Sequence, residues 1–89
     1  MQKVFVKCSV SSGMFPEERT VSFEEASGKT VSIFVPDKLI QDESFEAELL
    51  EEDSKTGLSL IKLPTYSAST SPHVVVKSEL LTKMSEAVV

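Results

Sequence analysis

Carboxylates are the most concentrated chemistry-bearing side chains in the sequence: half of the 14 lie between positions 42 and 53, a stretch without any basic residue. On an extended strand Glu46 and Glu48 project to one face, and we expect Glu52 to follow on the same side. One interpretation is an electronegative stripe that steers a basic partner toward the protein. The other is a solvated face that keeps an edge strand from pairing with other chains, and general experience with charge runs favours it.

These carboxylates do not match a catalytic or metal-binding pattern. A calcium loop needs closely spaced oxygen ligands around a glycine bend, but residues 53–57 place Lys55 where a ligand belongs. Paired catalytic carboxylates need a cleft that separates their pKa values, which a small barrel without long insertions does not offer. His73, the only histidine, follows Pro72 at the start of a predicted strand, and no nucleophile motif accompanies it. We therefore expect no catalytic residue, no metal site and no cofactor, and a protein that is not an enzyme.

Cys8 is the only cysteine, so it cannot form an intramolecular disulfide. With His73 as its sole soft partner it cannot form a zinc site either. It alternates with Val6 and Val10 on the inner face of a predicted strand, which favours a buried small hydrophobe over a reactive thiol. A single cysteine fits a reducing compartment, and the N-terminal residues lack the long apolar region of a signal peptide. We expect a cytoplasmic protein without a membrane-spanning helix.

A Met-Phe pair at positions 14 and 15 is the strongest candidate for binding, because it stands in a loop flanked by Gly13 and Pro16. In one alternative, Phe15 folds back over the end of a barrel as a lid. In the other, it joins outward-facing aromatic residues in a patch that binds a peptide or protein. The candidate members of this patch are Met14, Phe15, Phe5, Phe34 and Tyr66.

Period-two alternation of β-branched residues defines the elements that must position these side chains. We expect six strands, near residues 4–10, 19–25, 30–35, 42–53, 57–63 and 73–78. Residues 11–18 interrupt the pattern and are expected to form a loop. Residues 42–53 are also compatible with a helix, but the turn at 53–57 leads so directly into the next strand that a hairpin is favoured.

Short strands with closely spaced turns and no long helix predict a mainly β fold, either a small six-stranded barrel or a strongly curved antiparallel sheet. Its topology is SH3-like or OB-like, and the pattern does not separate the two. Short helical turns near 36–41 and 78–82 are expected to plug the barrel with four buried residues, Leu39, Ile40, Leu80 and Leu81. Residues 1–82 form one small β domain, and residues 83–89 form a C-terminal tail that frays.

Residues 34–40 and 75–81 share a layout, a β-branched strand followed by a Leu-apolar pair. This indicates two halves of about forty residues each, or alternatively a common way of closing a barrel; the pattern leaves both open.

The charge balance narrows the possible partners. Nine Lys and Arg residues against 14 Asp and Glu residues give a net charge of −5, and the basic residues are scattered singly. Nucleic acid and anionic membranes are therefore disfavoured. The function that fits best is a non-catalytic protein-interaction or structural module with an acidic face, whose partner is an unknown and basic protein or a second copy in a homodimer. The alternative is a small-barrel nucleic-acid-binding protein.

Overall fold

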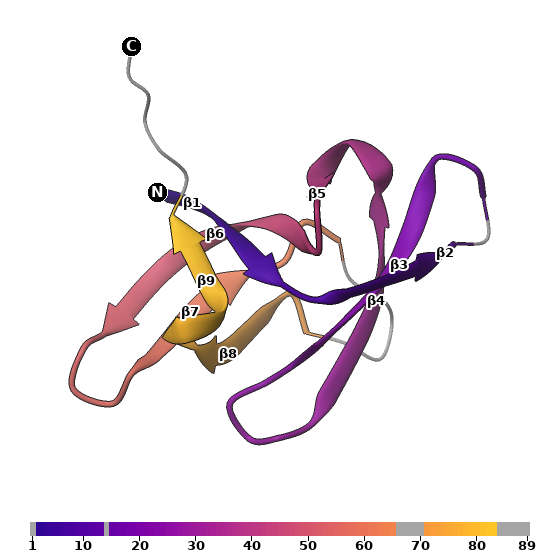
Figure 1. Ribbon diagram of the computed structural model, residues 1–89. Helices are drawn as coiled ribbons and strands as arrows, with labels where there is room; N and C mark the ends of the chain where they lie inside the picture. The colour runs from indigo at the N-terminus through magenta and orange to yellow at the C-terminus, as the bar shows by residue number, and fades with distance from the viewer. Residues whose placement is uncertain (1, 14, 66–70, 84–89) are drawn as a thin grey trace, which may run out of the picture.

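The computed structural model describes residues 2–13, 15–65 and 71–83, which form antiparallel strands and two three-residue 3₁₀ turns (Figure 1). The mainly β prediction is confirmed. The described part contains nine strands instead of six. The first predicted strand divides into two at Cys8, and two further strands, of two and three residues, are too short to show a period of two. In chain order the elements are β1 (Gln2–Lys7), β2 (Ser9–Ser12), β3 (Glu18–Glu24), β4 (Thr30–Pro36), η1 (Asp37–Leu39), β5 (Ile40–Gln41), β6 (Ser44–Asp53), β7 (Leu58–Lys62), β8 (His73–Lys77), η2 (Ser78–Leu80) and β9 (Leu81–Lys83).

The strands form two sheets. The larger sheet has the order β8-β7-β6-β1-β9, with β5 also paired to β6, and the smaller sheet has the order β2-β3-β4. β1 and β2 follow one another with only Cys8 between them, so this stretch passes from the larger sheet into the smaller one (Figure 1). The Cys8 N–H donates to the Glu43 carbonyl oxygen at 2.9 Å, which ties the crossing point to the start of β6.

The core lies between the two sheets and consists almost entirely of the inward positions of the alternating strands. Phe23 of the smaller sheet and Phe45 of the larger one are both buried, with ring centroids 5.4 Å apart and planes inclined by 45°. Buried hydrophobic side chains come from both sheets: Val4, Val6, Cys8, Val21, Phe23, Val31, Ile33, Val35, Phe45, Ala47, Leu49, Ile61, Leu63, Val74 and Val76. The predicted alternation therefore identifies the core, and Val75, between two inward valines, is 41% exposed.

Residues 42–53 contain a strand, as favoured, and not a helix. The register of β6 against β7 shifts between Leu49 and Glu51, which marks a β-bulge. After the bulge Glu51 lies opposite Leu60, and Glu52 lies opposite the buried Ser59. The prediction that Glu52 shares the face of Glu46 and Glu48 is therefore wrong, because the extra residue reverses the alternation.

The two 3₁₀ turns fall where short helical turns were predicted. The prediction that their apolar residues are fully buried is wrong. All four are half-buried, and all but Leu80 pack against the core: Leu39, Ile40, Leu80 and Leu81. The loop predicted to begin at residue 11 begins at Gly13 instead, because β2 continues through Ser12.

The two halves of the described chain repeat the same series of elements. β1/β2, β3, β4, η1 and β5 correspond to β6, β7, β8, η2 and β9. The first residue of each 3₁₀ turn donates its N–H to a backbone carbonyl oxygen at 2.8 Å, Asp37 to that of Glu17 and Ser78 to that of Gly57. Each acceptor residue immediately precedes the first strand of its hairpin, β3 or β7. The shared layout in the sequence is thus matched by the order of the elements in the two halves, with β6 in the place of both β1 and β2.

Two strands that end their sheets, β4 and β8, are not paired with one another or with any other strand of the described residues on their open sides. The sheets consequently do not join at this point. No helix in the described ranges is long and apolar enough to cross a membrane. Lys83 is the last residue of β9, and the remainder of the predicted tail lies outside the described residues.

Candidate functional site

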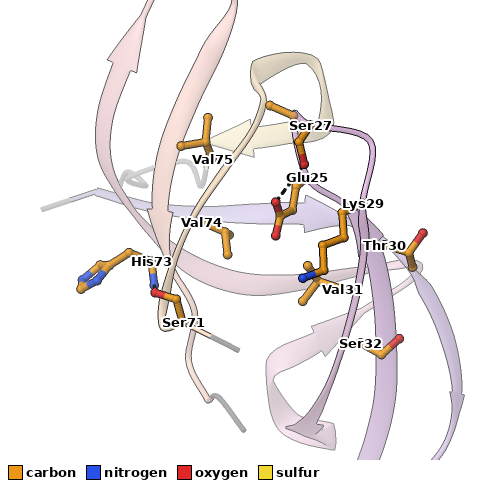
Figure 2. Close-up of a pocket in the computed structure, with 11 residues that line it drawn as sticks. Glu25, Ser27, Lys29, Thr30, Val31, Ser32, Ser71, His73, Val74 and Val75 are labelled. Carbon is orange, nitrogen blue, oxygen red and sulfur yellow. Dashed lines mark hydrogen bonds between the residues drawn. The ribbon is translucent and has the colours of Figure 1, made fainter. Parts of the chain in front are cut away.

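The most distinctive surface feature is a groove of about 850 Å³ between the open edges of β4 and β8, which we call the edge groove (Figure 2). It is lined by Thr30, Val31 and Ser32 of β4, by His73, Val74 and Val75 of β8, by Ser71, and by Glu25, Ala26, Ser27 and Lys29 of the β3–β4 turn. Each strand is an edge because it is the last strand of its hairpin and the chain leaves it through a 3₁₀ turn into the other part of the fold.

The direction of the main-chain groups of β4 follows from its ladder with β3. Successive residues in an antiparallel ladder turn their N–H and C=O groups alternately toward one side and toward the other. Glu25 N–H donates to the Lys29 carbonyl oxygen at 2.8 Å, so the odd-numbered residues of this hairpin bond across the ladder. The even-numbered residues of β4 therefore turn their main-chain groups to the open edge: Thr30, Ser32 and Phe34.

The same argument applies to β8. Leu63 N–H donates to the Pro72 carbonyl oxygen at 2.7 Å, so the even-numbered residues of β8 bond to β7. The main-chain groups of the odd-numbered residues turn to the open edge: His73, Val75 and Lys77. Main-chain groups of both walls therefore face the edge groove, although on β8 the His73 N–H donates to Ser71 Oγ at 3.2 Å and the Val75 carbonyl oxygen accepts from Ala26.

Among the described residues, each hairpin forms a hydrogen bond to the edge strand of the other one. Ala26 N–H, in the β3–β4 turn, donates to the Val75 carbonyl oxygen at 2.8 Å, and the Thr65 hydroxyl, after β7, donates to the Phe34 carbonyl oxygen. The turn before β4 thus meets the later part of β8, and the segment before β8 meets the later part of β4. The two edges run antiparallel, and these two hydrogen bonds bridge them within the part of the chain that the structure describes.

The side chains that line the edge groove include apolar, hydroxyl and charged groups. Val31 and Val74 are buried and form its floor. Glu25 and Lys29 extend between the two edges, and Ser27 Oγ donates to Glu25 Oε1 at 3.1 Å (Figure 2). The imidazole of His73 points away from both charged groups (Figure 2). The imidazole therefore does not face Glu25 or Lys29 across the groove.

The predicted aromatic patch divides between two places. Phe15 is 65% exposed in the loop between β2 and β3, so it is not a lid, and Phe34 is 44% exposed on the outer face of β4. Both lie toward the same end of the smaller sheet. Phe5 is half-buried on β1 of the larger sheet and does not join them. Met14 and Tyr66 lie outside the described residues.

The predicted acidic stripe is interleaved with lysines. Lys3 Nζ lies 3.0 Å from Glu46 Oε1, and this hydrogen bond raises the pKa of the lysine. Glu48 lies between Lys3 and Lys62 in the register of β1, β6 and β7. Glu52, on the other side of the sheet, has its Oε1 3.1 Å from Lys83 Nζ. The stripe is therefore a row of alternating charges, which weakens its field toward a basic partner.

Cys8 is buried, as predicted. Its burial, and to a smaller extent the negative charge of Glu43, raises the pKa of the thiol to about 11. Cys8 is thus a protonated thiol at neutral pH and a poor nucleophile. At the turn considered for calcium, Asp53 Oδ1 accepts a hydrogen bond from Lys55 N–H at 2.9 Å. Across the described ranges, no three His, Cys, Asp or Glu residues come together in a way that would hold a metal ion.

Sequence reasoning missed the edge groove, although it predicted both of its strands. Periodicity identifies which side chain points inward, but it does not show which strands end a sheet or face one another. The hydroxyl residues at Thr30 and Ser32 were the only local signal, because they place short polar side chains on an exposed strand. No protein-family model, curated protein or solved structure matches the chain.

Proposed function

We propose that the protein is a non-catalytic protein-interaction module. The observation that supports this best is the exposure of Phe15 and Phe34 at one end of the smaller sheet. Exposed phenylalanine rings lower solubility when no partner covers them, and aromatic residues are enriched in interface cores. The partner is another protein or a second copy of this chain.

The surroundings of Phe34 support the same proposal, because hydroxyl groups lie beside it on the outer face of the smaller sheet; the nearest charged residue on this face in the register, Glu18, lies in the next row, opposite Pro36. In the register of the smaller sheet Phe34 lies opposite Thr20, which in turn lies opposite Ser11. In the neighbouring row, the hydroxyl groups of Ser22 and Ser32 form a hydrogen bond, with their oxygens 2.8 Å apart. The centres of protein interfaces are depleted in charged residues, and these two rows of hydroxyl residues have that character.

For the fold, we propose a partly open SH3-like barrel in preference to an OB-like one. β1 lies between β6 and β9 in the larger sheet, and η2 immediately precedes β9. A last strand that enters through a 3₁₀ turn and pairs with the first strand is the arrangement of SH3-like barrels. The smaller sheet then takes the place of the long connection after the first strand.

The experiment compares the immobilised full chain with the double variant Phe15→Ser/Phe34→Ser in capturing proteins from a cell extract. The variant Phe15→Tyr/Phe34→Tyr is the matched control, because it keeps both rings. We expect a protein captured by the wild type and by the tyrosine variant to be lost from the serine variant, whose circular dichroism stays native. Equal capture by all three forms would contradict the proposal. Sedimentation of each form shows whether the partner is a second copy.

A further inference from the structure

We propose that the edge groove binds an extended segment of another protein as an additional β-strand, hydrogen-bonded to β4 on one side and to β8 on the other. The residues that line the edge groove do not include Phe15 or Phe34, so this inference can be tested separately from the aromatic surface proposed above. It rests on main-chain groups instead of exposed apolar side chains.

The main-chain groups in the edge groove match those of an extended peptide. Thr30 and Ser32 each turn an N–H and a C=O to the groove, and Val75 turns its N–H there. Among the described residues, none of these groups forms a backbone hydrogen bond to another segment of the chain. A row of unpaired main-chain donors and acceptors is a template for a further strand. Here the row on β4 faces the Val75 N–H on β8, where the Val75 carbonyl oxygen already accepts from Ala26 and the His73 N–H donates to Ser71 Oγ at 3.2 Å.

The fold keeps the two edges apart instead of letting them pair. The bonds from Ala26 to Val75 and from Thr65 to Phe34 already hold the hairpins together. Between these two hydrogen bonds a space of about 850 Å³ remains, and β4 and β8 form no ladder across it. Because the edges are antiparallel, an inserted strand runs antiparallel to one of them and parallel to the other. Both orientations satisfy main-chain hydrogen bonds.

The dimensions and lining of the edge groove define the segment. The walls are three residues long on each strand, which corresponds to about 10 Å of extended chain. Side chains of the segment alternate between the floor, formed by the buried Val31 and Val74, and the open side. The floor requires a small apolar side chain, such as alanine or valine. The oppositely charged Glu25 and Lys29 favour a segment without net charge at its centre.

The experiment selects ligands from a phage-displayed library of random twelve-residue peptides with the immobilised full chain. Selected peptides are synthesised with capped ends and titrated into the ¹⁵N-labelled protein. We expect the largest shifts at the amides of Thr30, Ser32 and Val75. No selected peptide above background, or shifts confined to the surroundings of Phe15, would overturn the groove proposal; the latter result would still support the aromatic surface.

A substitution tests the hydrogen bonds of β4. Ser32→Pro removes the N–H that faces the edge groove, and proline is tolerated where an edge-strand N–H points outward. Ser12→Pro is the matched control, because the register places the Ser12 N–H on the open edge of β2. We expect Ser32→Pro to weaken peptide binding about tenfold, the effect of one lost hydrogen bond, and Ser12→Pro to leave it unchanged. Equal binding by both variants would overturn the proposal.

A second test uses the unaltered protein, so it does not depend on the folding of a variant. Selected peptides are N-methylated either at their even or at their odd central positions. A strand bonded on both sides uses both sets of N–H groups, so each pattern should weaken binding at least about tenfold. A peptide that tolerates one of the two patterns is bonded on a single side, and that result would overturn insertion between β4 and β8.

Discussion

The contact between the Phe23 and Phe45 rings predicts a measurable coupling between the two sheets. The rings are buried, with centroids 5.4 Å apart, and come from different sheets. Such an aromatic pair contributes about 0.5–1.5 kcal/mol beyond the area that it buries. Phe23→Leu and Phe45→Leu each also lose packing, about 1–3 kcal/mol. Unfolding of a chain of this length requires roughly 4–13 kcal/mol, so both single variants should fold.

The assay is a double-mutant cycle by urea denaturation, followed by far-ultraviolet circular dichroism. We expect the double variant to be less destabilised than the sum of the single variants by about 0.5–1.5 kcal/mol. Phe34→Leu combined with Phe45→Leu is the control, and it should be additive because Phe34 lies on the outer face of β4. Additivity of the Phe23 and Phe45 effects within about 0.3 kcal/mol would refute a core shared by the two sheets.

Three further predictions concern single residues. Phe15→Ser should lower the unfolding free energy by less than about 1 kcal/mol, because only a third of the ring is buried; a larger loss in thermal denaturation would place it in the core. The thiol of Cys8 should react with a disulfide reagent at pH 8 only as fast as the protein unfolds. Because folding raises its pKa from 9.0 to about 11, the contribution of Cys8 to stability should be complete below pH 9 and be lost as the pH rises toward 11, so Cys8→Ala should make the fall in stability over this range smaller. Gly13→Ala should lower the melting temperature, because a Cβ there would collide with the Glu18 carbonyl group; an unchanged value would contradict the described turn.

Much of the fold was predictable because burial in a strand depends on local alternation. Val6 and Cys8 are inward in both the prediction and the structure. The position of Glu52 was not predictable in this way. One extra residue at the bulge after Leu49 reverses the alternation, and no residue type in that stretch indicates a bulge.

The candidate site was predictable only in part. The exposure of Phe34 follows from the parity of its strand, and the exposure of Phe15 follows from a loop that offers no covering element. The separation of Phe5 from Phe34 depends on which sheet each strand joins, and this is a property of the tertiary fold. The edge groove depends on the same long-range arrangement, because its walls are separated by about forty residues in the sequence.

Amide hydrogen exchange of the free protein tests the central claim, that β4 and β8 present unpaired edges to a groove. Exchange is slow where an amide is bonded within a stable ladder and fast where it is open to water. We predict an alternating pattern, with fast exchange at Thr30, Ser32 and Val75 and slow exchange at Val31, Ile33 and Val74. Equally slow exchange at all six amides would mean that β4 and β8 are bonded to one another, and would contradict the account.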